Sequence, residues 1–173
     1  MMITSALSPM PPKWVPGLVL AASIAVLGSA LISQYWGGLQ PCVLCLYQRY
    51  PYWLAIALSI LSLLALLKGA RHAAAALIAV AALAFLAGAA VAAFHVGVEQ
   101  HWWAGTAECG ASGPLGSGSA ADLRAKLLAQ PVVRCDEVAF SLFGISMAGF
   151  NFIISLALAA FAALGAKRIV SGD

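Results

Sequence analysis

Charged residues are scarce in this sequence. Lysine, arginine, aspartate and glutamate make up 9% of its 173 residues, whereas about 25% is usual in soluble domains. The formal net charge is only +3, and no basic run interleaved with aromatic residues occurs, so we expect no nucleic-acid partner. Hydrophobic residues make up 63% of the chain, and the mean hydropathy is +0.96. The composition therefore excludes an ordinary soluble domain and predicts a protein of the lipid bilayer.

Long polar segments are also few, and they separate four apolar stretches. A helix needs about 20 apolar residues to cross the bilayer, and each stretch approaches or exceeds that length. We predict an all-α membrane protein with a single domain over residues 1–173, built as a four-transmembrane-helix bundle. The expected helices are residues 14–34, 45–67, 73–96 and 143–165, with loops at 35–44 and 97–142 on one side of the membrane.

Details of three spans leave alternatives open. The first span is longer than the core of a signal peptide, about 7–15 residues, so we expect it to be retained, although Gly28-Ser29-Ala30 resembles a cleavage site. The second helix either begins at Pro51 or includes residues 46–49 and bends there, and its length favours the bent helix. Asn151 is the one strongly polar residue of the fourth span, where an interhelical hydrogen bond is favoured over a ligand contact.

The loop at residues 97–142 is the only sizeable polar segment. Its glycine-rich part predicts a flexible arm that carries Cys109 and Cys135. The stretch from Ser119 to Asp122 resembles a capping box and would open a short amphipathic helix that ends near Ala129. That helix could lie on the membrane surface.

The chain has only four cysteines, and two of them, Cys42 and Cys45, form a Cys-x-x-Cys pair. Two thiols at this spacing can close a disulfide, and a shared local field can lower the pKa of one of them for thiol exchange. Arg49 follows Cys45 by four residues, which on a helix places its guanidinium on the same face as that sulfur. A structural disulfide and half of a zinc site are the alternatives.

Basic residues near the ends of the spans predict the orientation of the bundle. Those that fall on one side are Lys13, Lys68, Arg71, Lys167 and Arg168. By the positive-inside rule this side is cytoplasmic, together with both termini. All four cysteines then lie on the opposite side, where disulfides persist. This placement favours redox chemistry over zinc, because a zinc site would require all four sulfurs to converge although one pair lies on a glycine-rich loop.

The cysteine motifs, taken with the four spans, resemble a known family. The most specific segments are Pro-Cys-Val-Leu-Cys-Leu-Tyr-Gln-Arg at residues 41–49 and Arg-Cys-Asp-Glu at residues 134–137, and the likeness continues through residues 142–151. Together they resemble the disulfide bond formation protein B (DsbB) family. The resemblance implies an enzyme of the bacterial inner membrane with its cysteines on the periplasmic side. Such an enzyme oxidises a DsbA-like periplasmic thiol oxidase and passes the electrons to the membrane quinone pool, as ubiquinone or menaquinone.

The resemblance also implies a role for each cysteine. Cys109 is the sulfur that the thiolate of the partner attacks, and Cys135 is the sulfur released. Cys42 and Cys45 form the pair that reoxidises the loop, and Cys45 engages the quinone. Arg49 stabilises the negative charge that develops beside Cys45.

Histidines near the end of the third span complete the expected quinone site. Some family members carry a histidine there, and in this chain His95 and His101 flank the position, so either is expected to contact the quinone, an interfacial histidine being the alternative for each. Two other functions remain open at this stage. One is a thiol oxidoreductase of the vitamin K epoxide reductase-like type with another acceptor or direction. The other is a membrane scaffold or metal-binding protein whose cysteines are structural.

Overall fold

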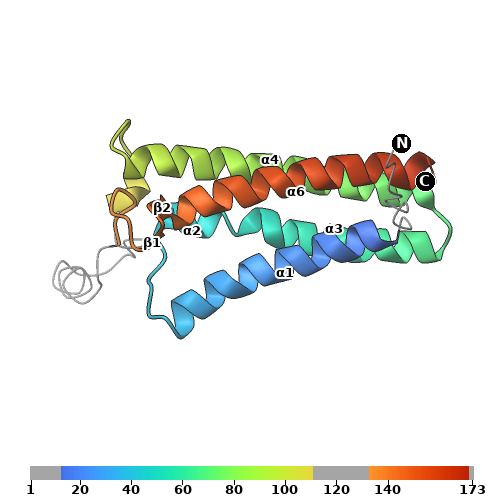
Figure 1. Ribbon diagram of the computed structural model, residues 1–173, viewed down its shortest axis with the longest axis horizontal. Helices are drawn as coiled ribbons and strands as arrows, with labels where there is room; N and C mark the ends of the chain where they lie inside the picture. The colour runs from blue at the N-terminus through green and yellow to red at the C-terminus, as the bar shows by residue number, and fades with distance from the viewer. Residues whose placement is uncertain (1–12, 111–132, 172–173) are drawn as a thin grey trace, which may run out of the picture.

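Four long apolar stretches of helix form the body of the protein. The computed structural model describes residues 13–110 and 133–171 (Figure 1). The helices of the bundle are α1 (Trp14–Tyr35), the short α2 (Val43–Tyr47), α3 (Tyr50–Leu67), α4 (Arg71–Glu99) and α6 (Met147–Ser171). Because α2 and α3 make one apolar stretch, the helices give four segments long and apolar enough to cross a membrane. The predicted all-α four-span bundle is confirmed.

Small residues let the helices approach one another closely. Helix α4 packs against α6 and α3, and α1 packs against α3 and α6 (Figure 1). The core between them is rich in alanine, with Tyr52 and Phe85 as its largest buried side chains. A Cβ atom on Gly88 would lie 3.0 Å from the Pro51 ring, and one on Gly165 would lie 2.3 Å from Val15. Close contacts of this kind let helices associate inside the bilayer, because no hydrophobic effect drives one helix against another there.

The second span is interrupted by a short turn at Gln48 and Arg49. Helix α2 begins at Val43, two residues earlier than expected, and ends before Gln48 and Arg49, after which α3 starts at Tyr50. Pro51 then occupies the first turn of α3, where its missing N–H leaves no bond unmade. The favoured alternative, a span that includes residues 46–49 and breaks near Pro51, is therefore close to the observed structure, except that residues 43–47 form a separate short helix.

The other differences lie at the ends of the third and fourth spans. Helix α4 runs from Arg71 to Glu99, beyond its expected end at residue 96, while the fourth span begins at Met147 instead of residue 143. Residues 141–146 instead form a hairpin of β1 (Ser141–Leu142) and antiparallel β2 (Ile145–Ser146). Phe143 and Gly144 both have positive φ, 52° and 79°, as a two-residue hairpin turn requires. The expected amphipathic helix of residues 119–129 lies outside the described residues.

The two ends of the bundle differ in chemistry. At one end lie the start of α1 with Lys13, the turn between α3 and α4 with Lys68 and Arg71, and the last turns of α6 (Figure 1). At the other end lie α2, the hairpin and the 3-10 helix η1 (Ala107–Gly110). All four cysteines belong to this second end, as the sequence predicted.

The contact between Gly165 and Val15 gives a test of the packing of α1 on α6. We expect Gly165→Ala to lower the midpoint of thermal unfolding in detergent, because the added carbon overpacks the contact at a cost of about 1–3 kcal/mol. Gly28→Ala is the matched control, since nothing lies within 4 Å of a Cβ atom at that position. Equal midpoints for the two variants would contradict this packing.

Candidate active site

The Cys-x-x-Cys pair lies at the start of α2. Cys42 is the N-cap residue, in extended conformation, and its sulfur accepts a hydrogen bond from the Cys45 N–H at 3.3 Å. The Cys45 thiol lies 3.0 Å from the Cys42 sulfur. Cys42 is 5% exposed, whereas Cys45 is partly exposed. The helix start thus holds both sulfurs together but turns them toward different surroundings.

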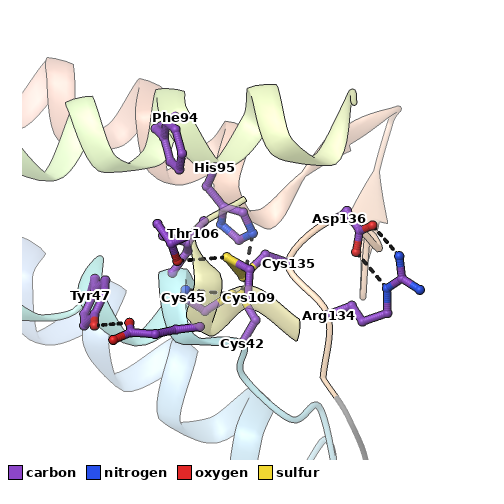
Figure 2. Close-up of a disulfide and its surroundings, with 12 residues drawn as sticks. Cys42, Cys45, Tyr47, Phe94, His95, Thr106, Cys109, Arg134, Cys135 and Asp136 are labelled. Atoms are coloured by element: carbon purple, nitrogen blue, oxygen red, sulfur yellow. Dashed lines mark hydrogen bonds and ion pairs between the residues drawn. A yellow bond between two sulfur atoms is a disulfide. The ribbon is translucent and has the colours of Figure 1, made fainter. Parts of the chain in front are cut away.

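The second pair, Cys109 and Cys135, forms a disulfide with its Cα atoms 5.2 Å apart. Cys109 belongs to η1, and the Cys135 N–H donates to the Cys109 carbonyl at 3.3 Å. Both residues pack in one buried cluster with Cys42, so the two pairs meet inside the protein (Figure 2). The Tyr47 hydroxyl, at the end of α2, donates to Glu108 beside Cys109 at 2.7 Å.

A histidine from α4 completes the surroundings of Cys42. His95 is 3% exposed, and its Nε2 lies 3.6 Å from the Cys42 sulfur (Figure 2). The Glu99 carboxylate lies 3.9 Å from the same nitrogen. The hydrogen bond from the Cys45 thiol and then that from His95 lower the pKa of Cys42 below that of an ordinary thiol, although burial opposes them. Cys42 is therefore prepared to act as a thiolate.

Gln48 connects this histidine to the neighbouring helices. Its side-chain nitrogen lies 2.9 Å from His95 Nδ1, and its oxygen accepts from the Asn151 amide at 2.6 Å. The Asn151 oxygen in turn accepts from the Tyr52 hydroxyl at 2.5 Å. The interhelical hydrogen bond predicted for Asn151 is confirmed. The sequence analysis missed Gln48 and Tyr52, and only the position of Gln48 inside the cysteine motif could have singled it out.

Cys45 faces a cavity of about 650 Å³ between α1, α2 and α6. Arg49 and Gln48 also line it, and the rest of its wall is mostly apolar, with Leu27, Phe140 and Met147 among the lining residues. Arg49 is held there by a hydrogen bond of 2.6 Å to Gln34 of α1. The volume of this cavity, its apolar wall and its few convergent polar groups are typical of a small-molecule site. They fit the head group of a quinone.

The two candidate histidines lie elsewhere. The cavity lining, as far as the structure describes the chain, includes neither His95 nor His101. His95, on α4, contacts Cys42, and His101 follows the end of α4 with a positive φ of 59°. That one of them contacts the quinone stays a prediction. Sequence spacing placed them near the cysteines but could not say on which side of the Cys-x-x-Cys pair they lie.

His101 instead lines a surface depression of about 600 Å³ beside the loop disulfide. Cys109 lines it as well, together with Arg134 and Asp136. The Arg134 guanidinium donates to both Asp136 oxygens, and this hydrogen bonding lowers the pKa of Asp136 to about 2 (Figure 2). The loop disulfide therefore meets the surface in a depression that carries a histidine and an ion pair and shares no lining residue with the cavity beside Cys45.

Cys42, Cys45 and His95 could also be considered as ligands of a metal ion. Their ligand atoms all lie within 4.8 Å of one another, and no fourth metal-binding side chain joins them in the described part of the chain. Two thiolates bound to tetrahedral zinc, each at about 2.3 Å, lie about 3.7 Å apart. The separation of 3.0 Å between these sulfurs is shorter. The arrangement therefore fits a redox-active pair better than a zinc site.

Known proteins resemble this chain over most of its length. An uncharacterized protein of Rickettsia prowazekii (strain Madrid E), RP370, is 26% identical over 148 residues, which are 85% of this chain and 83% of that protein. No solved structure matches the chain significantly. The family model of disulfide bond formation protein DsbB matches residues 12–165. With its four apolar spans and two cysteine pairs, the chain belongs to the DsbB family of disulfide-forming oxidoreductases.

Proposed function

We propose that this membrane oxidoreductase reoxidises a DsbA-like periplasmic thiol oxidase and passes the electrons to a quinone, ubiquinone or menaquinone. One observation carries the proposal. Cys42 is buried against the loop disulfide, whereas its partner Cys45 opens on an apolar cavity beside Arg49. Such an arrangement supports a relay that takes in electrons on one side and releases them on the other.

The relay begins at the loop pair. A thiolate of the partner attacks the Cys109 sulfur, a new disulfide forms between the two proteins, and Cys135 leaves as a thiolate. Two observations support Cys109 as the sulfur attacked: it lines the surface depression, and it is 8% exposed whereas Cys135 is 0% exposed. The second thiol of the partner then attacks the mixed disulfide, so the partner leaves oxidised and the loop pair is left as a dithiol.

The electrons pass next to the Cys-x-x-Cys pair. In its oxidised form this pair is attacked at Cys42 by the Cys135 thiolate, and Cys45 leaves as a thiolate on the cavity side. Cys109 then displaces Cys42, which restores the loop disulfide and leaves Cys42 and Cys45 reduced.

In the last step the reduced pair of Cys42 and Cys45 gives its electrons to an acceptor in the cavity. A bound quinone supplies the acceptor for two electrons and two protons, and the pair returns to a disulfide. Cys45 and Arg49 are the residues that we propose to hold the head group, because both line the cavity. The guanidinium stabilises negative charge there more strongly than in water, since the surroundings are largely apolar.

The orientation of the protein follows from its function and its charges. We place the end with Lys13, Lys68 and Arg71 in the cytoplasm of a bacterium, with the bundle in the inner membrane and the cysteines on the periplasmic side. This orientation presents the loop disulfide to a periplasmic partner. The cavity is lined both by residues of the spans and by residues of the loops at the cysteine end, so a molecule dissolved in the bilayer could approach it.

Loss of a cysteine tests the relay directly. With a reduced DsbA-like protein and ubiquinone, we expect the absorbance of the quinone to fall for the wild type and to stay constant for Cys42→Ser and Cys45→Ser, because each removes one of the two sulfurs that must close the disulfide. Cys109→Ser is also expected to block quinone reduction, because the thiolate of the partner then has no disulfide to attack. Full turnover by Cys42→Ser would contradict the proposal.

Replacement of Arg49 tests only the transfer of electrons to the quinone. Arg49→Gln should lower the rate of quinone reduction about 10-fold or more, since a hydrogen bond to a charged group is worth about 1.5–3 kcal/mol. Transfer of the disulfide from Cys109 to the partner, measured in one turnover without quinone, should not change. Arg134→Gln is the control, because it removes an arginine beside the loop disulfide and not one beside the cavity. It should leave the KM for quinone unchanged.

The hydrogen bond from Tyr47 to Glu108 tests the docking of the loop on α2. Tyr47→Phe should slow the exchange between the two pairs about 2- to 10-fold, because it removes a bond worth about 0.5–1.5 kcal/mol that holds Cys109 near Cys42. Stopped-flow mixing of the oxidised protein with reduced partner measures this exchange. Tyr50→Phe removes a hydroxyl from an exposed neighbouring ring, and equal slowing by both variants would refute the docking role.

A further inference from the structure

A chain of hydrogen bonds runs through the protein behind the cysteine pair and crosses three helices. It begins at the Tyr52 hydroxyl of α3, passes through the Asn151 amide of α6 and the Gln48 amide, and reaches the ring of His95 on α4. His95 ends the chain with Nε2 toward Cys42. Gln48 and His95 are 6% and 3% exposed, so within this buried region each polar atom must be paired by the protein itself.

One backbone group fixes the direction of this chain. The Gln48 amide nitrogen lies 3.2 Å from the Leu44 carbonyl oxygen, four residues earlier, and donates to it. If the amide were turned over, its oxygen would face that carbonyl oxygen, and two acceptors would be forced together. The Leu44 carbonyl therefore sets the Gln48 nitrogen toward α4. The Asn151 amide, which donates to the Gln48 oxygen at 2.6 Å, sets the same orientation from the other side.

The orientation of Gln48 decides where the proton of His95 lies. A neutral imidazole has one nitrogen that donates and one that accepts. Because the Gln48 N–H points at Nδ1 from 2.9 Å, Nδ1 must accept, and the proton must be on Nε2. Nε2 is the nitrogen that lies 3.6 Å from the Cys42 sulfur.

We propose that Gln48 and Asn151 are positioning residues that hold neutral His95 as its Nε2–H tautomer, so that the ring donates a hydrogen bond to the Cys42 sulfur instead of taking its proton. His95 then stabilises Cys42 whenever that sulfur carries negative charge. Two steps need this: the displacement of Cys42 by Cys109, and the closing of the disulfide with Cys45. The part of the inference that concerns these steps rests on the proposed function, whereas the tautomer does not.

The other groups that face Cys42 do not supply this donor. Cys45 of α2 is the second thiol of the pair, and from α4 the only other titratable neighbour is Glu99, which lies 3.9 Å from His95 Nε2 and is itself an acceptor for the Ser146 hydroxyl. The loop side presents the disulfide of Cys109 and Cys135, which does not titrate. Arg134 and Asp136 flank Cys135 and pair with each other. The lowered pKa of Cys42 agrees with a donor at this place.

The tautomer can be observed without any acceptor or partner. In protein labelled with ¹⁵N at histidine, the two ring nitrogens of His95 are identified by their loss in His95→Phe, and their chemical shifts report which one carries the proton. We expect a protonated Nε2 and an unprotonated Nδ1 at neutral pH. A proton on Nδ1, alone or together with one on Nε2, would overturn the inference.

The effect on Cys42 is tested by a double-mutant cycle. In protein with Cys45→Ser, Cys109→Ser and Cys135→Ser, Cys42 is the one thiol left, and its ultraviolet thiolate absorbance gives its titration midpoint. We expect Gln48→Met to raise the midpoint by about one pH unit, a tenfold change in the thiolate equilibrium, because the thiolate loses a directed donor. In His95→Phe protein the same substitution should add nothing, since Gln48 acts only through His95.

The controls separate this role from the others that Gln48 could have. Gln100→Met makes the same change at an exposed position on the end of α4 and should leave the midpoint in place. An equal shift by Gln48→Met with and without His95 would overturn the positioning role. Because no quinone is present, a direct contact between Gln48 and the acceptor cannot imitate the result. The failure of quinone turnover with the tautomer and midpoint as expected would instead count against the proposed function.

Discussion

The interruption of the second span governs the arrangement at the cysteine end. Pro51 has no N–H to donate back along the chain, and α2 ends at Tyr47, so Gln48 and Arg49 lie between two helices. From this position the two side chains extend toward different helices. Gln48 turns toward α4 and α6, while Arg49 reaches Gln34 of α1. One short break thereby supplies polar groups to both sides of the Cys-x-x-Cys pair.

The polar side chains buried behind Cys42 are tolerated because they satisfy one another. Inside an apolar bundle each unpaired donor or acceptor costs the free energy of its lost hydration. The hydrogen bonds among Tyr52, Asn151, Gln48 and His95 remove that cost and at the same time hold α3, α4 and α6 in one arrangement. Stability and the geometry of the reactive sulfur therefore rest on the same contacts.

The sequence predicted the fold and the cysteine end well, because those features depend on composition and on spacing along the chain. Apolar length alone indicated four spans, and the basic residues indicated which ends lie together. It did not predict that residues 43–47 form a separate short helix, or that Phe143 lies at positive φ in a turn before the fourth span. It also could not say which side of Cys42 would face His95, since that depends on the rotation of α4 within the bundle. The Gln48 contacts were hidden for the same reason, because they join residues far apart in the sequence.

The burial of Cys42 has a consequence for what can exchange electrons with the protein. Its sulfur is 5% exposed and lies between the loop disulfide and Cys45. Small thiols in solution and soluble oxidants therefore have little direct access to this sulfur. Burial alone excludes these molecules from Cys42, without a binding site that would distinguish one of them from another. In the relay proposed above, the packing of the bundle would by itself keep molecules in solution from exchanging electrons at Cys42.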